Sequence, residues 1–357
     1  MNDRIARLTE RLPDVGADLL MVTSLINVRY LTGFTGSNAI VLVGPDTRLF
    51  LTDFRYVEQA GAEVDASFDR RIVAQDLVDA VSDILPPGSP RLGFEDAHLT
   101  VRAYTRLHDR LPQGTELVAG GDTVESLRAV KEPEEIQRIA EATKLADAAF
   151  RRILERGLVG RTELDVATTL EREMRDLGAQ RPSFDSIVAA GPHGALPHAQ
   201  PRDVEISPGQ LVVIDWGAEL DGYCSDCTRT VATGDLDESA LRAYDLVHEA
   251  QLAGLEAVKP GVGGREADSV ARAVIDGAGH AEHYGHGLGH GVGLEVHEAP
   301  RLSQRSDSVL ASGNVVTVEP GVYLPGRFGV RIEDLVVVTE TGCNILTSVP
   351  KELITVG

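Results

Sequence analysis

The 357-residue sequence has few aromatic residues, few cysteines and no long apolar run, and each shortage excludes a class of protein. Aromatic residues make up 4%, but hydrophobic residues reach 43%, which is enough for globular cores. Three cysteines, an odd number, do not suit a disulfide scaffold and favour a reducing, cytoplasmic location. No membrane-spanning helix is expected without a long apolar run. The opening MNDRIARLTERL predicts an amphipathic helix, not a signal peptide, because no apolar stretch follows its charges.

Positive charge is also scarce. The sequence has 34 Lys and Arg residues against 55 Asp and Glu residues, which gives a formal net charge of −21. Phosphates would be repelled by such a chain, so nucleic acid is not an expected partner. The same excess of carboxylates can attract metal cations.

The length allows two domains, each with its own hydrophobic core. The first half alternates strand-like apolar runs with helical stretches, which predicts an α/β domain. The segment 123–135 is typical of a passage into a second domain. Beyond it, three segments have helical spacing: 133–154, 163–177 and 238–257. They alternate with two β-hairpins, so we predict an α/β N-terminal domain at 1–125 and an α+β domain at 126–357.

The first hairpin, LVVIDWGAELDGYCSDCTRTVA at 211–232, carries two aspartates. Asp221-Gly222 supplies turn chemistry. A turn centred there places Asp215 opposite Thr228, with Asp226 as its diagonal neighbour on the same face. A turn centred one residue earlier, on Leu220 and Asp221, places the two aspartates directly opposite each other, with Cβ atoms roughly 4.5–5.5 Å apart. Both registers bring the two carboxylates within reach of one metal ion.

The second hairpin, VVTVEPGVYLPGRFGVRIEDLVVV at 315–338, repeats this arrangement. Glu319 and Glu333 are equidistant from Gly326 in its Pro-Gly turn. Arg331 shares the face of Glu333, whereas Asp334 points to the other side. Opposed like charges destabilise a sheet unless a cation neutralises them. Solvated surface acids would explain one such pair, but two pairs embedded in apolar runs favour a metal site.

Between the hairpins lies a loop rich in histidine and glycine, HAEHYGHGLGHGVGLEVHE at 280–298. Its alternating glycines allow the backbone to pass close to a buried site. A phosphate-binding loop is disfavoured, because the spacing is not GxGxxG and no Lys-Ser/Thr follows. His297-Glu298 does not begin an HExxH zinc motif, because Arg301 fills the last place. His290 is the histidine that we expect to join the carboxylates.

Several strings of this sequence resemble one family, the pita-bread-fold metallopeptidases of the prolidase and aminopeptidase P branch. They are GPHGALPHAQP, DWGAELDGYCSDCTRT, HGLGHGVGLEVHE, TVEPGVY and RIED, together with SLINVRYLTGFTGSNA and TDFRYVEQA near the N-terminus. The resemblance implies a creatinase/prolidase-like N-terminal domain, a catalytic pita-bread domain and a homodimer. It covers nearly the whole chain.

The resemblance also assigns roles to individual residues. Two divalent cations are expected, with manganese preferred and cobalt or zinc as alternatives, because hard oxygen ligands with one imidazole suit these metals. The implied metal ligands are Asp215, Asp226, His290, Glu319 and Glu333. The implied catalytic residues are His198, His297, Glu319 (a proton shuttle) and Arg331 (which orders the site). The implied substrate-binding residues are His286, Tyr323 and Arg305.

Two features need separate interpretation. Cys224 and Cys227 flank Asp226 in a CSDC run that we do not associate with the family. A CxxC could indicate redox chemistry or zinc, but residues three apart on a strand face opposite sides, so we expect no joint role. Arg305, fourteen residues before Glu319, is either a grip for the carboxylate of a dipeptide or a solvated loop residue.

The predicted function is hydrolysis of an Xaa-Pro peptide bond by a hydroxide held between two metal ions. The expected substrates are short peptides with proline in second position, cleaved by an aminopeptidase P or by a dipeptidase (prolidase). A non-catalytic binding module and a creatinase-like C–N hydrolase share the fold, but the complete ligand set disfavours both. A methionine aminopeptidase is disfavoured by the large N-terminal domain.

Overall fold

The computed structural model describes residues 2–85 and 90–357, and the chain forms two compact units, Met1–Arg128 and Ala129–Gly357. The boundary that we predicted after residue 125 falls inside the last helix of the first unit, α6 (Thr123–Arg128). None of the helices in the described parts combines the length and the apolar character that crossing a membrane requires.

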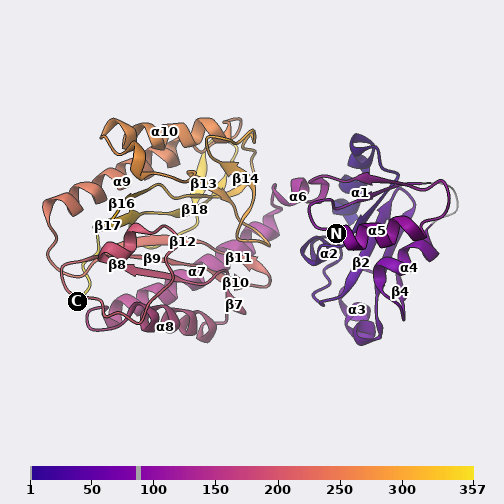
Figure 1. Ribbon diagram of the computed structural model, residues 1–357, viewed down its shortest axis with the longest axis horizontal. Helices are drawn as coiled ribbons and strands as arrows, with labels where there is room; N and C mark the ends of the chain where they lie inside the picture. The colour runs from indigo at the N-terminus through magenta and orange to yellow at the C-terminus, as the bar shows by residue number, and fades with distance from the viewer. Residues whose placement is uncertain (1, 86–89) are drawn as a thin grey trace. The chain divides into compact units, whose positions relative to one another are not determined.

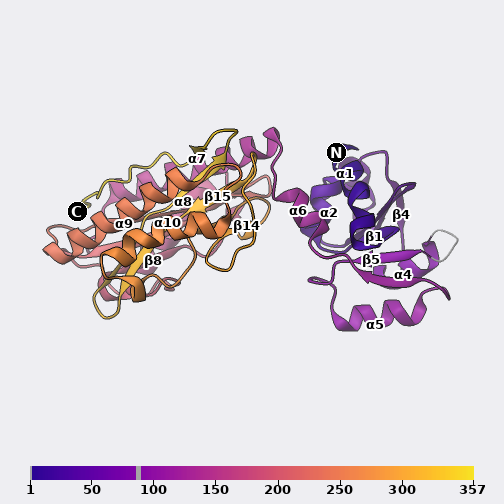
Figure 2. The same cartoon turned by 90° about the horizontal axis from the view of Figure 1, so that it is seen from above.

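The N-terminal unit is a mixed sheet covered by helices. Its strands are β1 (Leu19–Val22), β2 (Ala39–Gly44), β3 (Thr47–Thr52), β4 (Asp69–Ile72), β5 (Arg91–Phe94) and β6 (Glu116–Ala119). Its helices are α1 (Asn2–Arg11), η1 (Leu12–Val15), α2 (Leu25–Thr32), η2 (Phe54–Tyr56), α3 (Val57–Glu63), α4 (Leu77–Ile84), α5 (Val101–Arg110) and α6. The strand order is β4-β3-β2-β1-β5-β6, antiparallel in the middle and parallel at both edges. In Figure 2, α4 and α5 lie on one side of this sheet and α1 and α2 on the other, as the α/β prediction requires.

The C-terminal unit is built from strands enclosed by two helix pairs. The helices are α7 (Pro133–Arg156), α8 (Glu163–Asp176), η3 (Gly191–Ala195), α9 (Glu238–Ala257), α10 (Gly264–Gly277) and η4 (Ala281–His283). The strands before α9 are β7 (Arg181–Pro182), β8 (Ile187–Ala190), β9 (Leu211–Trp216), β10 (Ala218–Leu220), β11 (Tyr223–Cys224) and β12 (Cys227–Ala232). Those after it are β13 (Gly289–Gly291), β14 (Glu298–Leu302), β15 (Val315–Val318), β16 (Gly321–Leu324), β17 (Phe328–Arg331), β18 (Asp334–Val338) and β19 (Cys343–Ile345).

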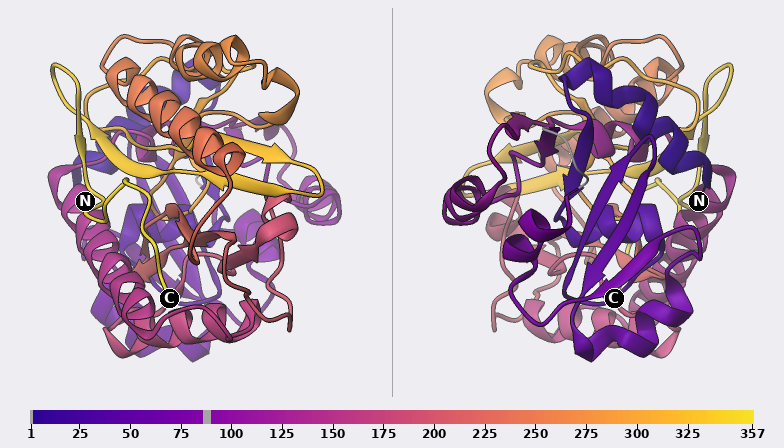
Figure 3. Two further views of the ribbon diagram at one scale, coloured as in Figure 1. Left: turned by 90° about the vertical axis from the view of Figure 1, so that its left-hand side faces the viewer. Right: turned by 90° about the vertical axis from the view of Figure 1, so that its right-hand side faces the viewer.

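Two apolar clusters hold the strands between these helices. Helices α7 and α8 pack on β8, β9 and β12, while α9 and α10 pack on the strands from β15 to β18 (Figures 1 and 3). The Trp216 ring stacks on Phe150 with centroids 4.0 Å apart, and its Nε1 donates to Ala146 O at 2.9 Å. This contact fixes the end of β9 against α7.

Of the four helices, α10 has no counterpart among the segments that we predicted.

Both predicted hairpins form, and their registers are now fixed. Asp215 pairs with Thr228, so the aspartates are diagonal neighbours. The turn uses Asp221 and Gly222, both at positive φ, as an Asp-Gly turn between two strands favours. In the second hairpin, Gly321 pairs with Arg331 and Val318 with Asp334, so the strands are symmetric about Gly326 as predicted.

Candidate metal centre

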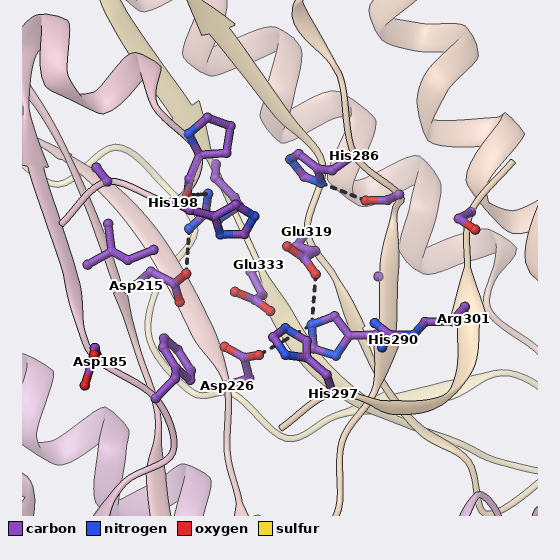
Figure 4. Close-up of a pocket in the computed structure, with 18 of the residues that line it drawn as sticks. Asp185, His198, Asp215, Asp226, His286, His290, His297, Arg301, Glu319 and Glu333 are labelled. Atoms are coloured by element: carbon purple, nitrogen blue, oxygen red, sulfur yellow. Dashed lines mark hydrogen bonds and ion pairs between the residues drawn. The ribbon is translucent and has the colours of Figure 1, made fainter. Parts of the chain in front are cut away.

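Four carboxylates and one imidazole converge on one cavity of the C-terminal unit, with a volume of about 570 Å³ (Figure 4). Donor atoms of Asp226, His290 and Glu333 lie within 4.8 Å of one another. Glu319 Oε1 is 3.2 Å from His290 Nε2, and Asp215 lines the same cavity. The structure therefore brings together all five residues that the sequence predicts as metal ligands.

Three of the four acids lie at interruptions of the two hairpins. Asp215 lies near the end of β9, but Asp226 lies in the break between β11 and β12. Glu319 lies between β15 and β16, and Glu333 between β17 and β18. The register is the same on both sides of each break, so each side chain keeps the face that the strand pattern gives it.

Contacts between the hairpins bring the two acid pairs face to face. Glu333 N donates to Thr228 O at 3.1 Å, and Arg331 N donates to the Thr230 hydroxyl at 3.0 Å. The segment 331–333 therefore lies alongside β12. Because each hairpin already presents its acids on one face, this pairing closes the cluster.

Two threonines orient the glutamates. The Thr228 hydroxyl donates to Glu333 Oε2 at 2.7 Å and accepts from Arg331 Nε at 2.9 Å. The Thr317 hydroxyl donates to Glu319 Oε1 at 3.0 Å. Neither threonine was predicted, although each lies two residues from a predicted ligand on the same strand face. The period-two pattern that links the acids could have identified them.

His290 presents one nitrogen to the acids. Its Nδ1 lies 3.1 Å from Gly291 O, and a carbonyl can only accept, so Nδ1 carries the proton in this contact. Nε2 faces Asp226 Oδ2 at 3.6 Å and Glu319 Oε1 at 3.2 Å. This arrangement, with the far nitrogen fixed by a backbone carbonyl, is typical of a metal-binding histidine.

The cluster holds more negative charge than the chain neutralises. Burial raises the pKa of Asp226 and of Glu333 well above the usual range, and the neighbouring carboxylates raise them further. Burial also opposes the ionisation of Glu319, but the hydrogen bond and charge of His290 outweigh it and hold that pKa at about 2. Arg331 Nη2 donates to Asp215 Oδ2 at 2.5 Å, and it is the one arginine or lysine that the described residues pair with these acids.

The donor atoms suit divalent cations. Over the described residues, Asp215 Oδ1 and Glu333 Oε1 are buried and receive no hydrogen bond. Buried carboxylate oxygens normally have a donor or a metal, because an unpaired buried charge is costly. Four carboxylates with one imidazole form the hard, oxygen-rich set that such ions bind. The residues therefore fit a divalent metal centre.

Three further predicted histidines lie on the cavity wall (Figure 4). The His297 ring packs against His290 with centroids 4.4 Å apart. Burial and the nearby positive charges of His290 and Arg301 lower the pKa of His297 to about 4, so it is neutral at physiological pH. His198 is exposed on the opposite part of the wall.

His286 differs, because both of its ring nitrogens are engaged within the protein. Nδ1 lies 2.8 Å from Gly287 O and therefore donates to it. Nε2 lies 2.9 Å from the Tyr323 hydroxyl, which in turn accepts from Arg331 Nη1 at 2.8 Å. The hydroxyl must therefore donate to His286. This chain connects His286 and Tyr323 to Arg331, behind the metal ligands.

The predicted Arg305 does not line the metal cavity. It borders a neighbouring cavity that shares His286, Gly287 and Ser303 with the first. Arg301, which we had considered only as the residue that breaks an HExxH motif, lines the metal cavity itself. Its position four residues after His297 was visible in the sequence, but the strand that carries it, β14, was not predicted.

The two cysteines of the CSDC run lie in different apolar clusters. Cys224 packs with Ile139 and Val292, whereas Cys227 packs with Trp216. Both are buried free thiols. Burial raises the pKa of Cys224 to about 12 and that of Cys227 well above the usual range, so both are protonated at neutral pH.

Comparison with known proteins agrees with this geometry. Residues 137–340 match the metallopeptidase family M24, and residues 4–130 match the creatinase/prolidase N-terminal domain. A Bacillus subtilis protein described as an uncharacterized peptidase, YqhT, is 44% identical over 98% of this chain and 99% of its own length.

Two solved structures share the whole fold. The Xaa-Pro dipeptidase from Bacillus anthracis is 41% identical with a TM-score of 0.96, and the match covers 99% of each chain. The X-Pro aminopeptidase from Thermotoga maritima is 38% identical with a TM-score of 0.89, and the match covers 98% of this chain and 99% of that one. These similarities confirm the predicted two-domain, pita-bread architecture. The chain belongs to metallopeptidase family M24.

Proposed function

We propose that this metallopeptidase hydrolyses the bond between the first residue and a proline in short Xaa-Pro peptides. The observation that carries the proposal is the cluster of four buried carboxylates and one imidazole, which the chain leaves short of positive charge. The names of two similar structures, an Xaa-Pro dipeptidase and an X-Pro aminopeptidase, supply the substrate class.

The proposed cofactor is a pair of divalent cations, with manganese preferred over cobalt or zinc. Asp215, Asp226, His290, Glu319 and Glu333, which line one cavity, would hold these ions. When bound, such ions activate water at neutral pH and polarise a carbonyl. Asp215 is held for this role by its hydrogen bond from Arg331.

The residues around the cluster supply proton transfer and charge stabilisation. We assign Glu319 to accept the proton of the attacking water and deliver it to the leaving nitrogen. The nitrogen that leaves when a peptide bond is hydrolysed must gain a proton, and the prolyl nitrogen then leaves as a secondary amine. His198 and the neutral His297 face the same cavity, where they can donate to the oxygen that develops negative charge.

Substrate selectivity would come from the remaining wall. Phe184, Ile187 and Pro197 provide an apolar surface for the first side chain and the proline ring. Arg301 is placed to accept the carboxylate of a dipeptide, a role that we had considered for Arg305. This placement favours a dipeptidase over an aminopeptidase P.

His286 and Tyr323 receive a different proposal from the one made on the sequence. Because they bond to each other, and Tyr323 bonds to Arg331, we assign them to support the metal ligands instead of binding the substrate directly.

A substrate panel tests this function. Chelator-treated protein is assayed with Xaa-Pro, Xaa-Pro-Yaa, the dipeptide amide Xaa-Pro-NH₂ and Xaa-Ala, with and without Mn²⁺, Co²⁺ or Zn²⁺. Metal-dependent cleavage of Xaa-Pro well above the amide and the tripeptide is the expected result. Preference for the tripeptide would identify an aminopeptidase P, and absence of Xaa-Pro cleavage with every metal would refute the substrate assignment.

We further propose a cytoplasmic homodimer. The three free thiols support a reducing compartment, and the family resemblance supports the dimer. Native mass measurement in solution tests the assembly, where a monomer would contradict it.

A further inference from the structure

His198 lies on an exposed part of the cavity wall and forms no hydrogen bond or ion pair through its ring in the described structure. Its position therefore depends on the backbone of the segment that carries it, 191–201. That segment leaves β8 after Ala190, passes through η3 and returns to the start of α8 at Arg202.

One buried carboxylate, that of Glu163, bonds to both ends of this segment. At the first end, Oε1 accepts from Ala190 N at 2.9 Å, and His193 Nδ1 lies 2.9 Å from Oε2. At the second end, Oε2 accepts from Arg202 N and from Arg202 Nε, each at 3.1 Å. The Glu163 side chain is 1% exposed, so water does not compete for these donors.

Each carboxylate oxygen of Glu163 accepts a backbone hydrogen bond from a different end of the segment. Oε1 serves Ala190, while Oε2 serves the Arg202 backbone, and the Arg202 guanidinium and the His193 ring reach both oxygens. An amide in this place would offer one oxygen and one NH₂ group. In either orientation its NH₂ would face backbone N–H donors at one end of the segment.

The helix itself does not need this carboxylate. Glu163 is the first residue of α8, and the N-cap Thr162 accepts from Asp165 N. The backbone of the helix start is held by Glu163 N to Val204 O at 3.1 Å and Leu164 N to Arg202 O at 3.0 Å. These bonds remain when the side chain changes, so the fold is expected to survive substitution.

We propose that Glu163 is a positioning residue for His198, which it holds at the cavity by bonding to both ends of segment 191–201. The role of His198 in this statement rests on the proposed function. A second contact supports the same segment nearer the site, since Arg331 Nη1 donates to Pro197 O at 3.1 Å. Glu163 thus bonds to the two ends of the segment, and Arg331 bonds to Pro197, the residue before His198.

The test compares Glu163→Gln with Glu173→Gln. Glu173 is a matched control, because it is a buried glutamate on the same helix that bonds to Arg152 and Arg156 away from the cavity. Glu163→Gln is expected to lower kcat by about 10–100-fold, the size expected for a displaced catalytic group, with metal stoichiometry unchanged. Glu173→Gln is expected to leave kcat within about threefold of wild type.

A double-mutant cycle shows whether the effect passes through His198. In a His198→Ala background, Glu163→Gln should cost less than about threefold, because the group that it positions is gone. An equal loss in both backgrounds would assign Glu163 to general stability and overturn the proposal, as would an unchanged kcat in Glu163→Gln.

Hydrogen exchange provides a readout that is independent of the substrate. Amides of 191–201 should exchange faster in Glu163→Gln than in wild type or Glu173→Gln, and unchanged exchange would overturn the proposal even if the enzyme acts on other peptides. Absence of Xaa-Pro cleavage by wild type would instead count against the proposed function.

Should Glu163→Gln not fold, Arg202→Met is the alternative variant, because it alters a half-exposed side chain. It should lower kcat and speed amide exchange of 191–201 in the same way, but by smaller amounts.

Discussion

Glu333 and Asp334 are neighbours in sequence and equally buried, yet they face opposite surroundings. Asp334 accepts from Arg229 at 2.8 Å and from Lys351 at 2.7 Å, so its charge is balanced by the chain. Glu333 receives the Thr228 hydroxyl on one oxygen and nothing from the described residues on the other. The difference separates an acid whose charge the chain balances from an acid that is suited to bind a cation.

The same contrast holds more widely in the C-terminal unit. Several other buried acids are paired with a basic residue, as in Lys131–Glu298 at 2.6 Å and Arg272–Asp268 at 2.9 Å, whereas Asp147 accepts from Ser348 N and Oγ. In the metal cluster, Arg331 is the one arginine or lysine that the described residues pair with any of the four carboxylates, and it pairs with Asp215. Shortage of positive charge together with convergence on one cavity, more than burial, therefore identifies the functional acids.

The largest expected effect is that substitutions of the two neighbours, Glu333 and Asp334, act on different properties: the first on activity and metal binding, the second on the stability of the fold. Glu333→Gln should lower activity by about 10³-fold or more and reduce metal binding, because a bridging ligand is lost. In metal-free protein the same change should not destabilise the fold, because burial and the neighbouring carboxylates already oppose the ionisation of Glu333. Asp334→Asn should destabilise the fold by about 3–5 kcal/mol, because it leaves Arg229 buried and underpaired.

Urea unfolding of both variants after treatment with a chelator measures their unfolding free energies, and titration of each variant with metal measures its metal binding. The contrast would fail if Glu333→Gln destabilised the metal-free protein as much as Asp334→Asn does.

Removal of metal should weaken the fold without unfolding it. Bound ions stabilise the native state by about 2.7 kcal/mol at a free concentration of one hundred times Kd. Chelation should therefore lower Tm, and added Mn²⁺ should restore it. Glu333→Gln serves as the control, and its Tm should change little on chelation. A wild-type Tm that does not respond to metal would contradict the charge-balance interpretation.

The register of the two hairpins shows why so much of the site could be predicted from the sequence. Asp215, Asp226, Glu319 and Glu333 are related by strand period and turn position, and both are local properties. The sequence left two registers open for the first hairpin, and the structure selects the one that uses the Asp221-Gly222 turn.

Other site features depend on contacts between distant segments, which spacing does not reveal. Whether Arg301 or Arg305 faces the cavity depends on the path of the chain through β14 and beyond, where Gly264 lies close to Arg301 O. Glu163 lies far before His198 in the chain, so nothing local connects them. The buried ion pair between Lys131 and Glu298 also joins residues far apart in the chain, so no sequence spacing predicts it.

A smaller effect should separate the two arginines. Arg301→Ala should raise KM for Xaa-Pro by about 10–100-fold, the size expected for a lost charged hydrogen bond, with little change for Xaa-Pro-NH₂. Arg305→Ala is the matched control and should change KM for either substrate less than threefold. A larger effect from Arg305→Ala would return the carboxylate role to that residue.

The smallest effect concerns the scaffold acid Glu163 and pH. Burial alone would raise the pKa of Glu163, but the hydrogen bonds from Arg202, Ala190 and His193 outweigh it and lower that pKa below 4.5. A depressed folded-state pKa contributes stability that is present above the unfolded pKa and is lost as pH falls through the folded value.

Wild type should therefore exceed Glu163→Gln in unfolding free energy at neutral pH, and the difference should shrink on acidification below pH 4.5. Urea unfolding of both chelated proteins across this range measures the difference. A difference that grows as pH falls would contradict the assigned contacts.

The most direct test of the central claim is a titration of metal-free wild type with Mn²⁺, in which bound metal and Xaa-Pro hydrolysis are followed together. The account predicts no hydrolysis without metal, and activity that rises to its maximum as two ions bind per chain. Full activity in rigorously metal-free protein, or saturation of activity without binding at the cluster, would contradict it.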